Sequence, residues 1–293
     1  MGAVIKTTAI VNDRSIKSSI SLAAAAGKAA IAKAGIAVHD VDLLINIGVY
    51  RDNNMVEPAM AALIQKEIGL NLDYLKQPVR KAAFGLDLMN GGCGIFNAMQ
   101  VASSFLTSGS ARYVLIVSSD IHPSTEDHAD FPYVPVGGAM VLGVSERAGA
   151  GLGRLAVRES DSTSPAVAGY YKCIADEGRR AITIVRDPGF AEHLLALATR
   201  NAREYIAAEK IDLSRTLLVT SQITADFGTR LAKQLDAPAH AVAKTTIDGD
   251  PHTSAITAAF HAAAEAGQLA KFDQVLFVGA GSGPMAACAV YRL

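Results

Sequence analysis

The sequence predicts an α/β protein made of two similar halves, residues 1–150 and residues 151–293. Continuous apolar strand patterns alternate with helical patterns, which is typical of parallel sheets buried between helices. The same order of patterns then occurs a second time along the chain. With 293 residues, 50% of them hydrophobic, the chain is long enough to bury the core that such a fold requires.

The elements of the first half follow in a clear order. A helix is predicted over about Ser19–Ala34, before a strand at Leu43–Ile47. The segment EPAMAALIQKEIGL is predicted to be helical because its apolar residues recur at three- and four-residue spacing. A glycine-rich turn then opens a helix from Cys93 to Gly109. The apolar runs ARYVLIVSSD and GGAMVLGVS predict the two strands that close this half.

The second half repeats this order after a joint near Gly149–Gly153. Apolar residues over 190–205 predict a long helix before a strand at Leu217–Thr220, and TADFGTRLAKQLDA predicts the next helix. A glycine-containing turn then opens a helix at His252. The apolar runs FDQVLFVGAG and MAACAVYRL predict the closing strands, as in the first half.

Composition excludes several classes of function. The formal net charge is −1 and no run of Lys or Arg occurs, which argues against nucleic acid as a partner. The apolar runs are short and broken by charges, so no membrane span is predicted. The first residues lack the long apolar stretch of a secretory signal, and three cysteines do not indicate a disulfide framework. We therefore expect a cytoplasmic protein.

The repeat places Cys93 and His252 at equivalent positions, each opening a helix after a glycine-containing turn. The partial positive charge of a helix N-terminus lowers the pKa of a thiol and disfavours imidazolium. Cys93 is therefore a candidate nucleophile and His252 a candidate base. Gly91, Gly92 and Gly94 would let a substrate carbonyl reach the thiol. The competing interpretations are a buried core cysteine and a histidine in a solvated loop beside a helix cap.

Other motifs give weaker predictions. Cys288 lies in an apolar strand pattern and is expected in the core, whereas Cys173 is expected in a loop or at an edge. The glycine-rich segment GAGSG precedes Pro284 and a strand rather than a helix, so it does not fit a dinucleotide site. The segment HPSTEDH, residues 122–128, lacks the spacing of metal ligands and is expected to be a solvated loop. No metal site is predicted.

Three segments together resemble the thiolase-fold condensing enzymes, and within them the β-ketoacyl-acyl-carrier-protein synthase III group. GGCGIFNAMQVASSFLTSGSARYVLIVSSD is similar to that group's nucleophile helix and the strand after it. PHTSAITAAFHAAAEAG is similar to a later helix of the group, and VGAGSGPMAACAVYRL to its glycine-rich C-terminal hairpin. The resemblance extends over nearly the whole chain.

The resemblance implies a thiolase-like fold of five αβαβα layers, with the two halves related by a pseudo-twofold axis. It implies that Cys93 accepts an acyl group from acyl-coenzyme A or an acyl-carrier protein, with no permanently bound cofactor. The backbone N–H groups of Cys93 and Ser282 would form the oxyanion hole. A homodimer is implied, and its interface is predicted near residues 80–92 and at the strand Arg112–Ser118.

Two catalytic positions depart from the synthase III pattern. That group carries His-Gln-Ala-Asn after the strand that matches Leu217–Thr220, whereas this chain has Ser221 in the sequence SQIT. His252 replaces an asparagine, as in chain-elongating synthases and thiolases. The second cysteine of thiolases is absent, since Phe277 stands in the matching region. The N-terminal segment is short, and the chain has no Trp to match the one that helps synthase III enzymes bind coenzyme A.

These observations predict an acyltransferase that forms an acyl-thioester on Cys93 and passes the acyl group to an acceptor. His252 would activate the thiol, and Ser221 would be at most a hydrogen-bonding partner. Because Ser221 replaces a histidine, transfer is not expected to use malonyl decarboxylation. A role in fatty acid or polyketide biosynthesis fits this chemistry. The alternative is a catalytically impaired subunit that pairs with an active homologue in a heterodimer.

Overall fold

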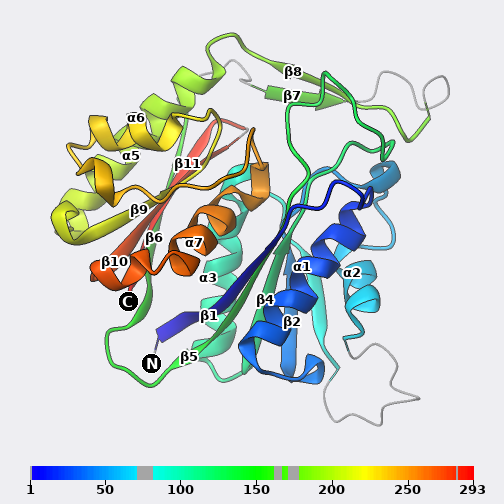
Figure 1. Ribbon diagram of the computed structural model, residues 1–293, viewed down its shortest axis with the longest axis horizontal. Helices are drawn as coiled ribbons and strands as arrows, with labels where there is room; N and C mark the ends of the chain where they lie inside the picture. Colours follow the sequence, from blue (N-terminus) through cyan, green and yellow to red (C-terminus); the bar gives the residue numbers. More distant parts are fainter. Residues whose placement is uncertain (1, 71–81, 162–166, 171–177, 282) are drawn as a thin grey trace.

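The computed structural model describes residues 2–70, 82–161, 178–281 and 283–293, together with the backbone of 167–170. The strands of these residues form a five-stranded sheet, a four-stranded sheet and a separate two-stranded pair. The two larger sheets are layered with helices between them and outside them (Figure 1). This arrangement confirms the α/β layered fold that the sequence predicts.

The five-stranded sheet comes from the first part of the chain and the four-stranded sheet from the second. In spatial order the first contains β1 (Gly2–Val11), β5 (Gly137–Ser145), β4 (Tyr113–Ser118), β2 (Val41–Asn46) and β3 (Phe84–Asp87). The second contains β6 (Gly151–Glu159), β11 (Met285–Arg292), β10 (Gln274–Gly281) and β9 (Thr216–Thr220). The chain passes from the first sheet to the second between Ser145 and Gly151.

Both sheets are mixed, which differs from the parallel sheets expected from the alternating pattern. Strands β3, β2 and β4 run parallel, as do β9 and β10. Strands β5 and β11 instead pair antiparallel with their neighbours on both sides. The physical reason is the connection: β4 and β5 are joined without an intervening helix, and β10 leads into β11 through a short turn, whereas parallel neighbours need a crossover.

The helices occupy three layers. Helices α1 (Ser19–Ala34) and α2 (Met60–Ile68) cover the outer face of the first sheet, and α5 (Phe190–Glu209) and α6 (Phe227–Gln234) cover the outer face of the second. Helices α3 (Gly94–Thr107) and α7 (Ala255–Glu265) lie between the sheets in the largest apolar cluster. Figure 1 shows this order of layers, αβαβα.

Helix α1 has the predicted bounds because local capping signals fix both of its ends. The Ser18 side chain accepts a hydrogen bond from the Ser21 N–H, and Gly35 ends the helix in the left-handed conformation. A carboxylate also stabilises the start of the helix, since Asp52 accepts hydrogen bonds from the Ser19 N–H and hydroxyl. Short-range sequence signals of this kind are sufficient to locate such a helix.

Two 3-10 turns, Gly91–Cys93 and His252–Ser254, precede the central helices α3 and α7 and contact each other. Each turn begins with a residue at φ 47°, Gly91 in one and His252 in the other. His252 is therefore the counterpart of Gly91, and Ser254, the N-cap of α7, is the counterpart of Cys93. The equivalence predicted between Cys93 and His252 is wrong by two residues, although both turns lie at the predicted place.

Strand β4 lies in the interior of the five-stranded sheet, between β5 and β2. Its residues Val114–Ser118 are buried, so this strand cannot form the predicted subunit interface. Strand β3, by contrast, is at the edge and pairs only with β2 among the described residues.

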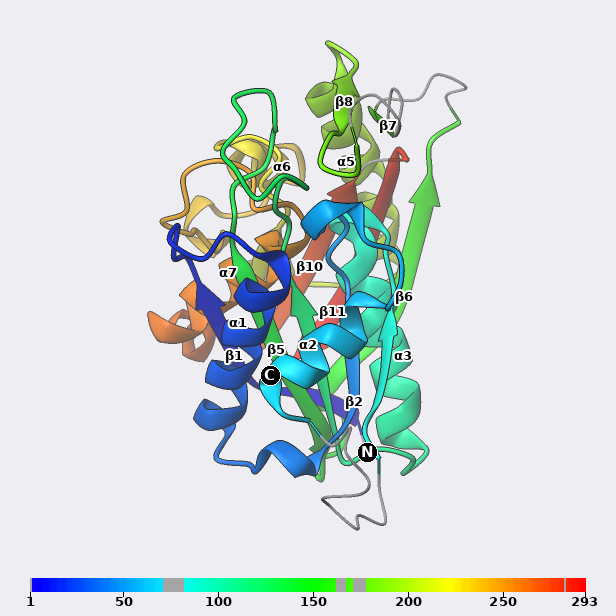
Figure 2. The ribbon, with the colours of Figure 1, turned by 90° about the vertical axis from the view of Figure 1, so that its right-hand side faces the viewer.

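The pair β7 (Val167–Tyr170) and β8 (Thr183–Arg186) lies at one end of the molecule, before the start of α5 (Figure 2). No helix in the described ranges is long and apolar enough to span a membrane.

Candidate active site

Cys93 ends the turn before α3 and forms the N-cap of that helix. It is buried, with 1% of its surface exposed, and its Sγ donates to the Met285 carbonyl oxygen at 3.6 Å. Burial raises the pKa of the Cys93 thiol to about 12. The structure thus contradicts the expected lowering of this pKa, because burial disfavours the charged thiolate.

Gly92, next to Cys93, makes room for the backbone at the end of β10. A Cβ added to Gly92 would lie 2.5 Å from the Ala280 carbonyl oxygen, and one added to Gly281 would lie 2.9 Å from the Gly92 nitrogen. The backbone of the cysteine turn and the end of β10 thus approach each other too closely for side chains. This contact fixes the position of Cys93 against the second sheet.

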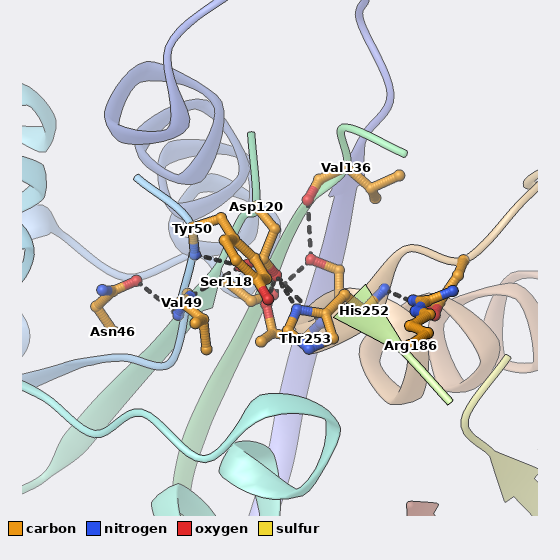
Figure 3. Close-up of polar contacts among 12 residues, drawn as sticks. Asn46, Val49, Tyr50, Ser118, Asp120, Val136, Arg186, His252 and Thr253 are labelled. Carbon is orange, nitrogen blue, oxygen red and sulfur yellow. Dashed lines mark hydrogen bonds and ion pairs between the residues drawn. The ribbon is translucent and has the colours of Figure 1, made fainter. Parts of the chain in front are cut away.

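His252 is held by Asp120, a residue that the sequence analysis did not identify. The Nδ1 atom of His252 lies 3.0 Å from Asp120 Oδ2, which also accepts hydrogen bonds from the Thr253 N–H and hydroxyl. The other oxygen, Oδ1, accepts from the N–H groups of Val49 and Tyr50, both at 2.8 Å. Figure 3 shows the Asp120 carboxylate between the 49–50 backbone and the imidazole.

These contacts determine the proton positions of the pair. Burial opposes ionisation of Asp120, but the charge and hydrogen bonds of His252 and Thr253 more than offset it and hold the pKa of Asp120 below its ordinary value. An ionised carboxylate only accepts hydrogen bonds, so Nδ1 of His252 carries the proton. In the neutral imidazole, Nε2 then has a lone pair. That Nε2 atom is buried and has no hydrogen-bond partner among the described residues.

Aromatic rings cover the imidazole. The Tyr133 ring stacks on His252 with centroids 4.0 Å apart, and the Tyr50 ring lies 5.6 Å away. Burial raises the pKa of both tyrosines, so their hydroxyls stay neutral. The rings limit the movement of the imidazole and shield it from water.

His252 faces a small cavity next to the cysteine turn. The cavity has a volume of about 10 Å³, room for roughly one water molecule. Its walls come from the ends of β8 and β10, the start of α5, and the turns and loops beside them: Gly92, Tyr133, Arg186, Phe190, Leu194, Ser221, Ile223, Asp250, His252, Ala280 and Gly281. The turn that carries Cys93 and the base therefore border one space. Entry of an acyl chain requires these walls to separate.

Ser221 lies in this cavity wall, as its position after β9 predicts. Its hydroxyl accepts a hydrogen bond from the Ala280 N–H at 3.0 Å and lies 3.3 Å from the Ala280 carbonyl oxygen as a donor. The hydroxyl thus bridges the ends of β9 and β10. In this state its single proton is directed at the protein backbone.

The other predicted positions are the two oxyanion-hole residues, Cys93 and Ser282, and the other two cysteines. The Cys93 N–H donates to the Asn90 carbonyl oxygen at 3.0 Å, and Ser282 lies outside the described residues, as does Cys173. Cys288 is buried in the core as expected, with the Asn201 side-chain amide 3.3 Å from its sulfur.

The loop 122–128 is more packed than predicted. The rings of His122 and His128 stack at 3.6 Å, and the Ser124 hydroxyl lies 2.8 Å from a nitrogen of each. His122 is 7% exposed, so the expectation of a fully solvated loop is wrong here. Among the described residues no cluster of His, Cys, Asp or Glu is arranged to hold a metal ion.

Sequence comparisons connect the chain with known enzymes, although no protein-family model matches it. The β-ketoacyl-[acyl-carrier-protein] synthase III of Listeria welshimeri is 28% identical over 269 residues, which cover 89% of this chain and 79% of the relative. The synthase III of Thiobacillus denitrificans is 27% identical over 277 residues, with 89% and 80% covered. The match therefore extends over most of both chains.

Structural comparisons agree on the fold. The synthase III of Aquifex aeolicus superimposes with a TM-score of 0.78 at 18% identity, and all of both chains is covered. OleA from Xanthomonas campestris gives a TM-score of 0.79 at 17% identity, with 100% of this chain and 99% of that chain covered. The layered sheets and these comparisons show that the chain has the fold of these thiolase-like structures, and that its sequence is similar to synthase III over most of its length.

Proposed function

We propose that this protein is an acyltransferase that forms an acyl-thioester on Cys93 and passes the acyl group to an acceptor. The observation that carries the proposal is the state of His252. Asp120 holds its Nδ1, its Nε2 has no hydrogen-bond partner among the described residues, and His252 lines the cavity beside the cysteine turn. A fixed base next to a thiol is the arrangement that covalent acyl transfer requires.

The proposed reaction proceeds through two transfers. The thiol must leave the Met285 carbonyl and turn toward His252, whose Nε2 takes its proton. Sγ attacks the carbonyl carbon of the donor thioester, and the carbon–sulfur bond to the donor breaks. The leaving thiolate takes the proton from His252. An acceptor nucleophile then gives its proton to His252 and attacks the acyl-enzyme, and the bond between the acyl carbon and Sγ breaks. Cys93 leaves as a thiolate and takes the proton back from His252.

The donor in this proposal is an acyl-coenzyme A or an acyl-carrier protein. The synthase III relatives carry the acyl-carrier protein in their name, and an OleA structure from Xanthomonas campestris contains lauric acid and lauroyl-CoA. Fatty acid or polyketide biosynthesis in the cytoplasm, by a homodimer, completes the proposal. The oxyanion hole of Cys93 and Ser282 also belongs to it, and an oxyanion would have to replace or share the Asn90 carbonyl at the Cys93 N–H.

Intact mass spectrometry tests the proposal directly. The protein is incubated with acetyl-, octanoyl- and lauroyl-coenzyme A, and we expect one added acyl group that is sensitive to hydroxylamine. The adduct should vanish in Cys93→Ala and persist in the matched variant Cys288→Ala, whose thiol is buried in the second sheet. An adduct that survives in Cys93→Ala would exclude this nucleophile.

A catalytically impaired subunit in a heterodimer remains the second candidate function. The small cavity and the raised pKa of the Cys93 thiol favour it, because both oppose acylation in this structure. This candidate predicts no adduct with any donor and a stable complex with an active homologue. Light scattering of the mixed and separate chains distinguishes the two candidates.

A further inference from the structure

Arg186, the last residue of β8, lines the same cavity as His252. Its guanidinium carbon lies 4.8 Å from the centroid of the Tyr133 ring and 5.3 Å from that of the Phe190 ring. Contacts with two aromatic faces hold the guanidinium in place while its N–H edge can still donate hydrogen bonds. In Figure 3, Arg186 lies on the side of His252 opposite Asp120.

Two donor atoms of the Arg186 guanidinium are left unused by the residues that the structure describes. Its Nε and Nη2 are buried and have no hydrogen-bond partner among the described residues. The Nη2 atom forms an ion pair with Asp250 Oδ2, but the distance of 3.6 Å is too long for a hydrogen bond. The other oxygen of Asp250 accepts from the His252 N–H at 2.8 Å, so this carboxylate also serves the histidine turn.

Buried donors without partners are unfavourable, and they are most costly on a charged group. A protein commonly retains such a group where a ligand completes its hydrogen bonds. The planar edge formed by Nε and Nη2 matches the two oxygens of a carboxylate, which arginine binds with two parallel hydrogen bonds. A lysine at this position would offer the charge without that geometry.

We propose that Arg186 binds a carboxylate of the substrate in the cavity that contains His252, and so selects substrates with an acidic group near the reacting carbonyl. The inference rests on the proposed acyl transfer, whose substrate class it narrows. The carboxylate can belong to the acyl donor, as in a malonyl or succinyl thioester. It can equally belong to the acceptor, as in an amino acid or a hydroxy acid.

The donor arm of the test measures binding without chemistry, in a Cys93→Ala background. Isothermal titration compares malonyl-coenzyme A with isovaleryl-coenzyme A, its neutral analogue of similar shape. If the donor carries the carboxylate, Arg186→Gln weakens malonyl-coenzyme A binding about 10- to 100-fold and leaves isovaleryl-coenzyme A unchanged. Arg186→Lys should recover only part of the loss.

The acceptor arm uses the enzyme with Cys93 intact and loaded with an isovaleryl group. Loss of the acyl mass is followed with glycine against glycinamide, and with lactate against lactamide. If the acceptor carries the carboxylate, the acids release the group faster than the amides, and Arg186→Gln removes that preference. The control Arg112→Gln, at an exposed arginine outside the cavity, should change neither arm.

The outcomes separate the two proposals. If Arg186→Gln weakens the binding of charged and neutral ligands equally, Arg186 has a purely structural role as the counter-ion of Asp250, and the inference is overturned. The inference is also overturned if the protein does not distinguish carboxylate-bearing from neutral donors in the first arm, nor acids from amides in the second. If the protein with Cys93 intact forms no acyl-enzyme, the proposed function fails, and the donor arm alone then decides the role of Arg186.

Discussion

Asp120 Oδ2 lies 3.0 Å from His252 Nδ1, and this contact joins the end of β4 to the turn before α7. It determines which imidazole nitrogen carries the proton and leaves Nε2 with the lone pair in the neutral ring. The carboxylate makes no contact with the cavity itself among the described residues. Asp120 is thus a positioning residue, and its effect on the reaction passes through His252.

Replacing Asp120 should therefore impair acylation beyond its effect on stability. Asp120→Asn removes the charge that fixes the His252 proton, and an amide cannot accept every donor that the carboxylate satisfies. We expect acylation of Cys93 to slow about 100- to 10,000-fold, measured by intact mass. The control is Asp87→Asn, another carboxylate with little exposure that accepts backbone N–H groups, here those of Met60 and Ala61. Equal slowing in both variants would show a stability effect only.

The same carboxylate predicts a pH dependence of stability. Because the pKa of Asp120 is lowered in the folded protein from its ordinary value of 3.8, the ionised carboxylate contributes to the stability of the folded state above that pH. It is lost as the pH falls below 3.8 toward the folded pKa. Urea unfolding between pH 6 and pH 3 should show a smaller loss of stability in Asp120→Asn than in the natural chain. An identical slope would contradict the ionised carboxylate.

The Cys93 thiol should react slowly with alkylating agents in the free protein. With its pKa raised to about 12, the thiolate fraction at pH 7 is very small, and it grows about tenfold per pH unit. Iodoacetamide labelling of a Cys173→Ser, Cys288→Ala chain should follow that slope from pH 7 to pH 9. Rapid labelling at pH 7 with a plateau by pH 8 would show instead that the helix N-terminus controls the thiol.

Malonyl decarboxylation should be slow in the natural chain. The enolate that forms on loss of carbon dioxide needs donors, and the Ser221 proton is directed at the Ala280 carbonyl. A missing donor of this kind is worth about 100- to 1,000-fold in rate. Carbon dioxide release from malonyl-coenzyme A should be equally slow in Ser221→Ala. Fast release that falls sharply in Ser221→Ala would show that the serine does act as the donor.

The edge strand β3 predicts where two copies meet. Its Phe84 is 58% exposed and nearby Met89 is 53% exposed, within the predicted interface near residues 80–92. An edge strand that pairs on one side only offers its other side to a second chain. Light scattering should show a dimer that Phe84→Lys dissociates, whereas the control Val157→Lys on β6 should leave it intact. A monomeric natural chain would contradict this prediction.

Local sequence signals predicted most of the secondary structure. Helix α1 has the predicted bounds, Ser19–Ala34, and the residues next to it in the sequence, Ser18 and Gly35, cap it. The antiparallel pairing of β5 was not predicted, since a buried apolar strand has the same pattern in either direction. Sheet order depends on the connections in three dimensions, which periodicity does not encode.

The candidate site was predicted in part for the same reason. Cys93 and His252 were found from their glycine-containing turns, which are local features. Asp120 ends the run YVLIVSSD, and that terminal acid after a buried strand was the only available signal. The raised pKa of Cys93 and the unused donors of Arg186 arise from burial by distant segments. Neither property is present in any short stretch of the chain.

The residues of the candidate site come from the two different parts of the chain that form the two larger sheets. Cys93 and Asp120 belong to the part of the chain that forms the first sheet, whereas His252 belongs to the part that forms the second. Separating the two layers would move the base away from both its anchor and the thiol while each sheet kept its own hydrogen bonds. Activity would then be lost before secondary structure, so a loss of activity would detect separation of the two sheets.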